Sequence, residues 1–338
     1  MWRPPHFWSA PETTIAAALL SPIAAIYAVA SSLRFALATP AKVPLPVICV
    51  GNPGMGGAGK TPTAIAIAKR LAANGATPHF LTRGYGGKLR GPVQVDPARH
   101  SSIDVGDEPL LLAKVAPTHV ARDRAAGAYH AVDAGAGCII MDDGFQNPTL
   151  AKDCSLLVID GAAGIGNGWV FPSGPLREPL LPQLARAEAV LVIGSGHPGE
   201  AVSQTAARAN VPVVKGQLRV GKNAPDLDGR PVIAFCGIAR PEKFFASLED
   251  FGAEIAAKIT FDDHHPYLRR DVARIIELAA RHDGAAVVTT EKDLVRLDDT
   301  NDPGAALRSE LQILPIEVVF AETEPLDALL NAAMRAKL

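Results

Sequence analysis

The chain has 338 residues, of which 48% are hydrophobic and 20% are charged, and its formal net charge is -2 at pH 7. This composition excludes a disordered protein and provides enough residues for two domains of ordinary size. A general nucleic-acid binder is disfavoured, because such proteins usually carry a marked positive excess. The four cysteines contain no C-x-x-C pair and lie in or beside apolar runs, so we expect buried thiols in a reducing compartment.

The N-terminal segment, residues 1–38, is alanine-rich and apolar, and we expect it to form a helix at the membrane interface. Residues 13–33 are uncharged, and Pro22 interrupts them. A transmembrane span, a signal peptide ending at residues 36–38 and a helix packed on the protein body are the alternatives. The side chains expected near the lipid headgroups are Trp2, Arg3, Phe7, Trp8, Tyr27 and Arg34.

A strand, a glycine-rich loop and a helix are predicted in direct succession from Val47 onward. The loop fits the phosphate-binding pattern G-x-x-x-x-G-K-[ST], and the apolar run VICV before Gly51 is the strand that should feed it. Glycines let successive backbone N–H groups face an anion, and the start of the helix adds its positive end. We expect Lys60 to reach the outer phosphates of ATP and Thr61 to bind Mg²⁺. The predicted nucleotide contacts are Gly54, Gly56, Gly57, Ala58, Gly59, Lys60 and Thr61.

Further strands and helices follow the loop helix, and one of the strands ends in two carboxylates. Strands are expected at 78–83 and 118–121, and helices at 107–115 and 122–134. The apolar strand CIIM comes next and runs directly into Asp142-Asp143-Gly-Phe-Gln146. Phosphate-loop enzymes hold magnesium at this end of such a strand, so both aspartates are candidate ligands. Asp-Asp-Gly is also a common turn, which is the alternative reading.

A long loop over residues 161–182 separates the next two predicted strands, at 154–160 and 189–194. It is too long for a simple connection and is therefore a candidate binding segment. The loop contains the charged pair Arg177-Glu178 in a proline-flanked stretch. An exposed ion pair with no further role is the alternative for these two residues.

The pattern changes over residues 211–230, where alternating apolar residues lead into a polar turn, and we place a domain boundary there. The expected units are a nucleotide-binding domain at 39–215, a linker at 216–230 and a second α/β domain at 231–338. The runs VIAFCG, EIAAKITF, AAVVTT and IEVVF predict a second mostly parallel sheet. Helices are expected between and after these strands, at 241–250, 268–281 and 325–336.

The second predicted domain contains one dense polar motif, Asp262-Asp263-His264-His265-Pro-Tyr, directly after a strand. Open α/β sheets bind ligands at the carboxyl ends of their strands, and a histidine beside carboxylates suits acid-base chemistry near neutral pH. A polar turn that caps the next helix is the alternative reading.

Several motifs together resemble the tetraacyldisaccharide 4'-kinases of lipid A synthesis. They keep the family's order from the N-terminal helix to Asp293, and they are GNPGMGGAGKTP, LTRGYGG, GDEP, DDGFQ, LREP, FCGIARPEKFF, FDDHHPY and TTEKD. The resemblance implies a mostly parallel α/β fold of the P-loop NTPase type with a second, smaller α/β domain. It also implies a kinase that uses ATP and Mg²⁺ to phosphorylate the 4'-hydroxyl of tetraacyldisaccharide 1-phosphate.

By the same resemblance, the enzyme works at the cytoplasmic face of the bacterial inner membrane, as a peripheral or monotopic protein. The implied partners are the lipid-linked disaccharide and an anionic membrane surface, with no nucleic acid and no obligatory protein partner. A partner-driven ATPase switch at the membrane is the alternative function. A GTPase of the usual kind is disfavoured, because TEKD at residues 290–293 does not have the spacing of N/T-K-x-D.

The resemblance also implies roles for individual side chains. Asp107 in GDEP is expected to accept the acceptor's proton with the help of His264, which becomes possible when the cleft between the domains closes. Lys60 and Arg124 are expected to face the transferred phosphoryl group, with Arg122 as the competing choice. Two residues, Asp262 and Asp263, are candidates for orienting the histidine. The implied magnesium and nucleotide shell is Thr61, Asp142, Asp143, Gln146 and Glu178.

Overall fold

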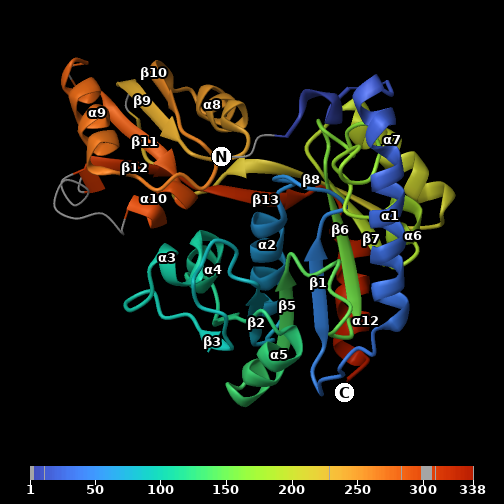
Figure 1. Ribbon diagram of the computed structural model, residues 1–338. Coiled ribbons are helices and arrows are strands. Elements are labelled where there is room, and N and C mark those ends of the chain that lie inside the picture. Colours follow the sequence, from blue (N-terminus) through green and yellow to red (C-terminus); the bar gives the residue numbers. More distant parts are fainter. Residues whose placement is uncertain are drawn as a thin grey trace.

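The computed structural model describes residues 4–10, 12–227, 229–282, 284–297, 307–308 and 310–337. Within these residues the chain forms a nine-stranded sheet and a four-stranded sheet, each covered by helices (Figure 1). The predicted α/β class with two sheets is confirmed. The predictions for Trp2 and Arg3 lie outside the described residues.

The large sheet has the order β13-β8-β7-β6-β1-β5-β2-β4-β3. Its strands run parallel, except that β3 is antiparallel to β4 and β13 is antiparallel to β8. Central strands such as VICV and CIIM are apolar throughout because helices cover both faces of the sheet. The strands are β1 (Val47–Gly51), β2 (Pro78–Thr82), β3 (Val93–Gln94), β4 (Thr118–Val120), β5 (Cys138–Asp142), β6 (Cys154–Asp160), β7 (Ala189–Ile193), β8 (Val213–Val220) and β13 (Ile316–Phe320).

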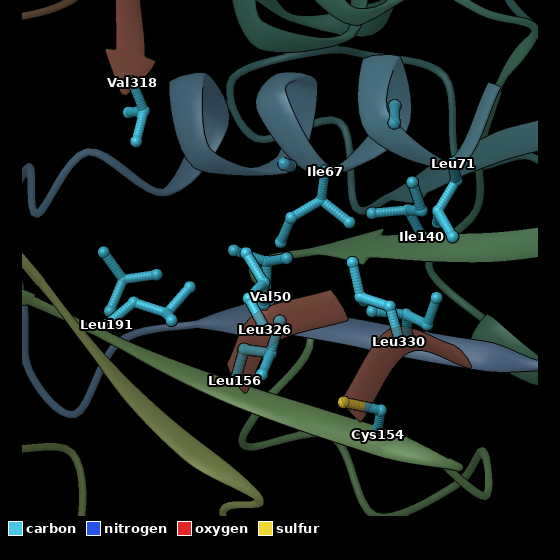
Figure 2. Close-up of a cluster of buried hydrophobic side chains, with 14 of the residues drawn as sticks. Val50, Ile67, Leu71, Ile140, Cys154, Leu156, Leu191, Val318, Leu326 and Leu330 are labelled. Atoms are coloured by element: carbon cyan, nitrogen blue, oxygen red, sulfur yellow. The ribbon is translucent and has the colours of Figure 1, made fainter. Parts of the chain in front are cut away.

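Helices α2 (Lys60–Ala73) and α12 (Glu324–Arg335) cover one face of this sheet. Figure 2 shows Ile67 of α2 and Leu326 of α12 converging on strand residues such as Val50. Each such side chain contributes about 1.5 to 3 kcal/mol when it is fully buried. The opposite face is covered by α5 (Arg124–Asp133), α6 (Leu180–Leu184) and α7 (His197–Arg208). The short helix α4 (Asp107–Ala113) adds Leu112 to the face that α2 and α12 cover, and the other short helices are η1 (His6–Trp8) and α3 (Ser102–Val105).

The small sheet has the order β10-β9-β11-β12, and its described strands are parallel. Helix α8 (Pro241–Asp250) packs on one face through Phe244 and Leu248, and α9 (Arg269–Ala280) packs on the other through Val272 and Ile275. The strands are β9 (Pro231–Cys236), β10 (Glu254–Thr260), β11 (Ala286–Thr290) and β12 (Leu311–Leu314), and helix α10 (Glu291–Leu297) follows β11.

The chain's C-terminal part differs from the predicted domain boundaries. The run IEVVF was expected in the second sheet, but as β13 it pairs with β8, from Ile316 opposite Val220 to Phe320 opposite Gly216. The following helix, α12, packs in the large core rather than on the small sheet. The predicted domain 231–338 and linker 216–230 are therefore wrong in this respect, and the small unit is an insertion between β8 and β13. Alternation shows that a segment is a strand, but not which sheet it joins.

Helix α1 (Ile15–Leu37) lies along the flank of the large unit, near α6 and α7 in Figure 1. The Thr14 side chain caps its start by accepting a hydrogen bond from Ala17 N. The helix buries only the small side chains of Ala17 and Ala24. On the opposite face, exposed apolar side chains recur every three or four residues, and they are Ile15, Leu19, Ile23, Ile26, Val29, Leu33 and Leu37.

The N-terminal aromatic residues attach this helix to the protein instead of extending away from it. Trp8 is buried, and its indole Nε1 donates to Pro172 O at 3.0 Å. The rings of Trp8 and Tyr27 both meet Phe171 of the long loop edge-on. The expectation that Trp8 lies at headgroup depth is therefore wrong, because this side chain is buried between the N-terminal segment and the long loop of the large unit.

Candidate active site

The phosphate-binding loop lies between β1 and α2, as predicted. Gly59 caps α2 with φ of 83°, in the left-handed region that side chains with a Cβ rarely adopt. Gly51, at the end of β1, allows the close approach of the DDGFQ segment, because an added Cβ would lie 2.5 Å from Phe145 Cβ. The loop faces a cleft of about 2320 Å³ that extends between the two units. The residues of the loop that line it are Met55, Gly56, Gly57, Ala58, Gly59, Lys60 and Thr61.

Asp142 and Asp143 meet the start of α2 from the end of β5. The Thr61 hydroxyl donates to Asp142 Oδ2 at 2.9 Å, and Lys60 Nζ lies 3.7 Å from Asp143 Oδ1. Burial raises the pKa of Asp142 to about 7. Burial also acts to raise the pKa of Asp143, but the positive charges of Lys60 and Arg177 outweigh it and lower this pKa to about 2. The two adjacent carboxylates therefore differ in proton affinity.

Arg177 is a site residue for which sequence reasoning assigned no role. Its guanidinium donates to both carboxylate oxygens of Asp143, at 2.9 and 3.1 Å, and to Gln146 Oε1 at 3.2 Å. Gln146 in turn donates to Asn52 O, which holds it beside the phosphate loop. The position of Arg177 in the long loop, within the LREP motif, is the sequence signal for this role.

Glu178 does not join the other candidate magnesium ligands. Its side chain is buried and forms an ion pair with Arg186, at 2.5 Å between Oε2 and Nη2. Arg177 lines the cleft, whereas Glu178 does not. The two side chains leave a bend of the loop in different directions, so only Arg177 reaches the cleft.

Arg124 begins α5 and is buried, with its guanidinium donating to Ala121 O. Burial lowers the pKa of this arginine to about 10. Its Nε has no hydrogen-bond partner among the described residues. Arg122 is exposed, and both arginines line the cleft. Arg124 is thus the more desolvated of the two candidates for contact with a phosphoryl group.

Asp107 and His264 are already joined across the two units. His264 Nδ1 lies 2.9 Å from Asp107 Oδ2, whereas Asp263 Oδ2 is 3.8 Å from the other ring nitrogen, Nε2. The hydrogen bond to Asp107 raises the pKa of His264. Burial acts to raise the pKa of Asp107, but the hydrogen bond from His264 and the charge of Lys292 outweigh it and hold this pKa below its ordinary value. His264 lines the cleft, and Asp107 lies behind it.

The contact between α4 and α10 holds this pair together. Lys292 of α10 forms an ion pair with Glu108 at 2.8 Å, and Val295 packs among apolar side chains of the large unit such as Val105 and Leu111. The two units are therefore in direct contact at the Asp107 side of the cleft. The segment 237–243 makes a second contact, in which Arg240 and Lys243 both bind the Asp160 carboxylate beside the phosphate loop.

A phosphate loop at the carboxyl ends of a parallel sheet, with paired carboxylates beside it, defines a nucleotide-binding protein of the P-loop type. A histidine and carboxylate pair facing the same cleft adds a group that can accept a proton. This combination is that of a phosphotransferase with an acceptor that carries a hydroxyl group.

Comparison with known proteins identifies the family. Residues 16–335 match the family described as Tetraacyldisaccharide-1-P 4'-kinase. The tetraacyldisaccharide 4'-kinase of Rhodospirillum centenum is 49% identical over 99% of this chain and 98% of that protein. The corresponding protein of Methylobacterium nodulans is 52% identical over 99% of this chain and 96% of its own length. The chain belongs to the tetraacyldisaccharide 4'-kinase family, as its motifs predicted.

A solved structure supports the same assignment. The crystal structure of the "apo" form of LpxK from Aquifex aeolicus in complex with ATP aligns with a TM-score of 0.74 and 25% sequence identity. The alignment covers 95% of this chain and 100% of the Aquifex aeolicus chain. The predicted fold and the predicted enzyme class, a kinase, are confirmed.

Proposed function

We propose that this chain transfers the γ-phosphate of ATP to the 4'-hydroxyl of a tetraacyldisaccharide 1-phosphate, with Asp107 and His264 managing the acceptor's proton. The observation that carries the proposal is the joining of this pair between the two units, at 2.9 Å, with His264 facing the cleft that the phosphate loop also lines. Donor phosphates on the loop and an acceptor hydroxyl at the histidine would share one space.

The proton acceptor is Nε2 of His264. The ring's other nitrogen is engaged with Asp107, and the carboxylate lies behind the ring with a depressed pKa, which makes it a weak base. As the hydroxyl attacks phosphorus, its proton moves to Nε2, and the Asp107 carboxylate stabilises the imidazolium that forms. This assignment reverses the order expected from sequence, in which Asp107 took the proton.

The donor phosphates are bound by the phosphate loop. Backbone N–H groups from Gly56 to Thr61 and the start of α2 face the anion, and Lys60 reaches its outer oxygens. Arg124, whose Nε has no partner among the described residues, supplies charge to the phosphoryl group in transit. Gln146 and Arg177 hold the wall of the site beside the loop.

The oxygen atoms at the end of β5 fit a magnesium ion. Asp142 Oδ1 is buried and has no hydrogen-bond partner among the described residues, and Oδ2 of the same residue accepts from Thr61. Magnesium is usually held by one or two carboxylates together with phosphates and water, and no larger cluster of ligands is found in the described part of the chain. We assign Thr61, Asp142 and Asp143 to it and leave Glu178 out. When bound, it would neutralise charge on the β- and γ-phosphates.

Helix α1 attaches the enzyme to the inner membrane from the cytoplasmic side, where ATP is available. It is apolar and long enough to cross a bilayer, at 23 residues. However, its inner face contacts the body repeatedly, from buried Ala17 through Tyr27 on Phe171 to Arg34 on Gln146 O. A helix held along its length against a folded domain lies in the interface rather than across it, with the outward stripe in the lipid.

The test is phosphoryl transfer from γ-labelled ATP to tetraacyldisaccharide 1-phosphate in mixed micelles, with and without Mg²⁺. A labelled lipid that forms only with Mg²⁺ is expected. Intact protein that forms no labelled lipid would refute the proposal, and ATP hydrolysis that a partner protein stimulates and lipid does not affect would favour the ATPase switch. A vesicle flotation assay, with and without residues 1–38, tests the attachment.

A further inference from the structure

We infer that Arg296 is a positioning residue that sets the geometry of the Asp107–His264 pair from behind. The inference rests on the proposed role of that pair in catalysis. Arg296 lies three residues beyond the TTEKD motif, on α10, and none of the roles described above falls on it. It is 5% exposed and does not line the cleft, so it acts through other residues and does not touch the substrates.

Arg296 binds Asp107 directly and is linked to His264 through the carbonyl of Gly237. Its Nε donates to Asp107 Oδ2 at 3.1 Å, the same oxygen that His264 Nδ1 approaches. Its Nη1 donates to Gly237 O at 2.6 Å, and this carbonyl also accepts the backbone N–H of His264 at 3.2 Å. One guanidinium therefore fixes the carboxylate from one unit and the backbone that carries the histidine from the other.

The backbone of His264 needs such support. Its φ is 58°, in the left-handed region that costs a residue with a side chain about 1 kcal/mol or more. The hydrogen bond from His264 N to Gly237 O helps hold this conformation, which directs the ring toward Asp107. Anything that moves Gly237 O would move the ring with it.

Asp293, the last residue of TTEKD, holds Arg296 in turn. This carboxylate is fully buried, and its Oδ1 accepts from Arg296 Nη1 at 3.2 Å, from Gly237 N at 2.9 Å and from Tyr267 OH at 2.7 Å. Its Oδ2 accepts from Thr290 Oγ1 at 2.6 Å. The arginine is thus clamped between two buried carboxylates, which compensates its charge and leaves its planar fork little freedom.

The experiment compares Arg296→Met and Arg296→Lys with the unmodified full-length chain, by measuring kcat and both KM values across pH. Arg296→Met removes the charge and the fork, so kcat should fall about 10- to 100-fold with KM for ATP nearly unchanged. The acidic limb of the kcat profile should also move to higher pH, because a positive charge beside Asp107 has been lost. Arg296→Lys should restore the acidic limb but only part of kcat, since a lysine ammonium group cannot reproduce the planar guanidinium that donates to both Asp107 and Gly237.

The inference would be overturned if Arg296→Met kept the kcat and the acidic limb of the unmodified chain. It would also be overturned if the only change were a higher KM for ATP. Arg281→Met is the matched control, because it removes an arginine of the same unit that forms an ion pair with exposed Glu277, and it should not change kcat or the acidic limb. If Asp107→Ala and His264→Ala keep full activity, the proposed pair itself has failed. If these two are inactive and Arg296→Met is not, only the present inference has failed.

Gly237→Ala decides the question if Arg296→Met does not fold. The added Cβ would lie 3.0 Å from Asp262 O, 3.1 Å from Arg296 Nη1 and 3.3 Å from Asp293 Oδ1, so these groups must shift while every charge remains. The expected result is a lower kcat with an unchanged acidic limb. A Gly237→Ala enzyme with wild-type kcat would overturn the inference.

Discussion

Replacing Asp107 with asparagine removes one charge at constant size and so tests the catalytic pair directly. Among the described residues, three donors point at this carboxylate: His264 Nδ1 at 2.9 Å, Arg296 Nε at 3.1 Å and Glu108 N at 3.0 Å. Asparagine offers one acceptor oxygen, and its amide group must face at least one of these donors. The site is 4% exposed, so leaving a donor unpaired there costs about 1 to 3 kcal/mol.

The effect on the reaction should exceed the effect on stability. Without the carboxylate, the imidazolium at His264 loses its partner, and kcat should fall on the order of a hundred- to ten-thousandfold. That fall corresponds to about 3 to 5 kcal/mol of transition-state stabilisation. KM for ATP should stay nearly constant, because Asp107 does not line the cleft. The assay is steady-state transfer of label from ATP to the lipid acceptor, with nucleotide affinity measured separately.

The matched control for this variant is Asp104→Asn, one turn upstream. Asp104 accepts hydrogen bonds from Ser101 N and Oγ in a capping box and does not line the cleft. Its loss should weaken this capping box only slightly and leave kcat unchanged. An Asp107→Asn enzyme that keeps kcat within about tenfold of the unmodified chain, or whose loss lies in KM for ATP, refutes the role given to the pair.

Other predictions concern pH, the donor site and the membrane. The pKa of His264 is raised in the folded protein, so the histidine stabilises the fold fully below about pH 6.5, and this stabilisation is lost as pH rises through the pKa of the folded state. The loss of unfolding free energy in His264→Gln should therefore be larger at about pH 6 than at about pH 9. Lys60→Ala should lower kcat/KM on the order of a hundredfold in the transfer assay. Thr61→Val should raise the Mg²⁺ concentration for half-maximal rate about tenfold, whereas Thr61→Ser should not. Leu19→Glu combined with Ile26→Glu should weaken vesicle binding about a hundredfold, because these side chains are 75% and 71% exposed on the outward stripe.

Each of these predictions can fail in a recognisable way. A pH-independent difference for His264→Gln would mean that the ring and Asp107 are not coupled. Full activity in Lys60→Ala would place the donor phosphates elsewhere, and equal Mg²⁺ requirements in the two Thr61 variants would remove that hydroxyl from the ion. Unchanged vesicle binding after the double substitution in α1 would assign the attachment to another surface.

Sequence patterns located most of the elements because each pattern is local. The apolar runs of β1 and β5, the glycine at the start of α2 and the carboxylates after β5 are contiguous in the chain, and they remain together in the fold. The position of β13 was not predictable in this way, because its pairing with β8 is a contact between distant segments. The same holds for the contact of Arg296 with Asp107, which joins helices from different units.

Loop geometry explains why the sequence predicted Glu178, and not Arg177, as the site residue of the long loop. Arg177 and Glu178 are neighbours with equally plausible chemistry, and no periodicity orders a loop of this kind. The fold resolves the choice by burying Glu178 against Arg186 and turning Arg177 toward Asp143.

The insertion of the small unit between β8 and β13 has a consequence for biosynthesis. Helix α12 supplies Leu326, Leu330 and Ala333 to the large core, yet in the chain it follows the whole inserted unit. The nucleotide-binding sheet is therefore missing part of its cover until the whole inserted unit has been translated. A premature stop after the small sheet would leave the apolar side chains of the large sheet beneath α12 exposed to solvent. The truncation would therefore destabilise the nucleotide-binding unit, most of which is translated before the small unit.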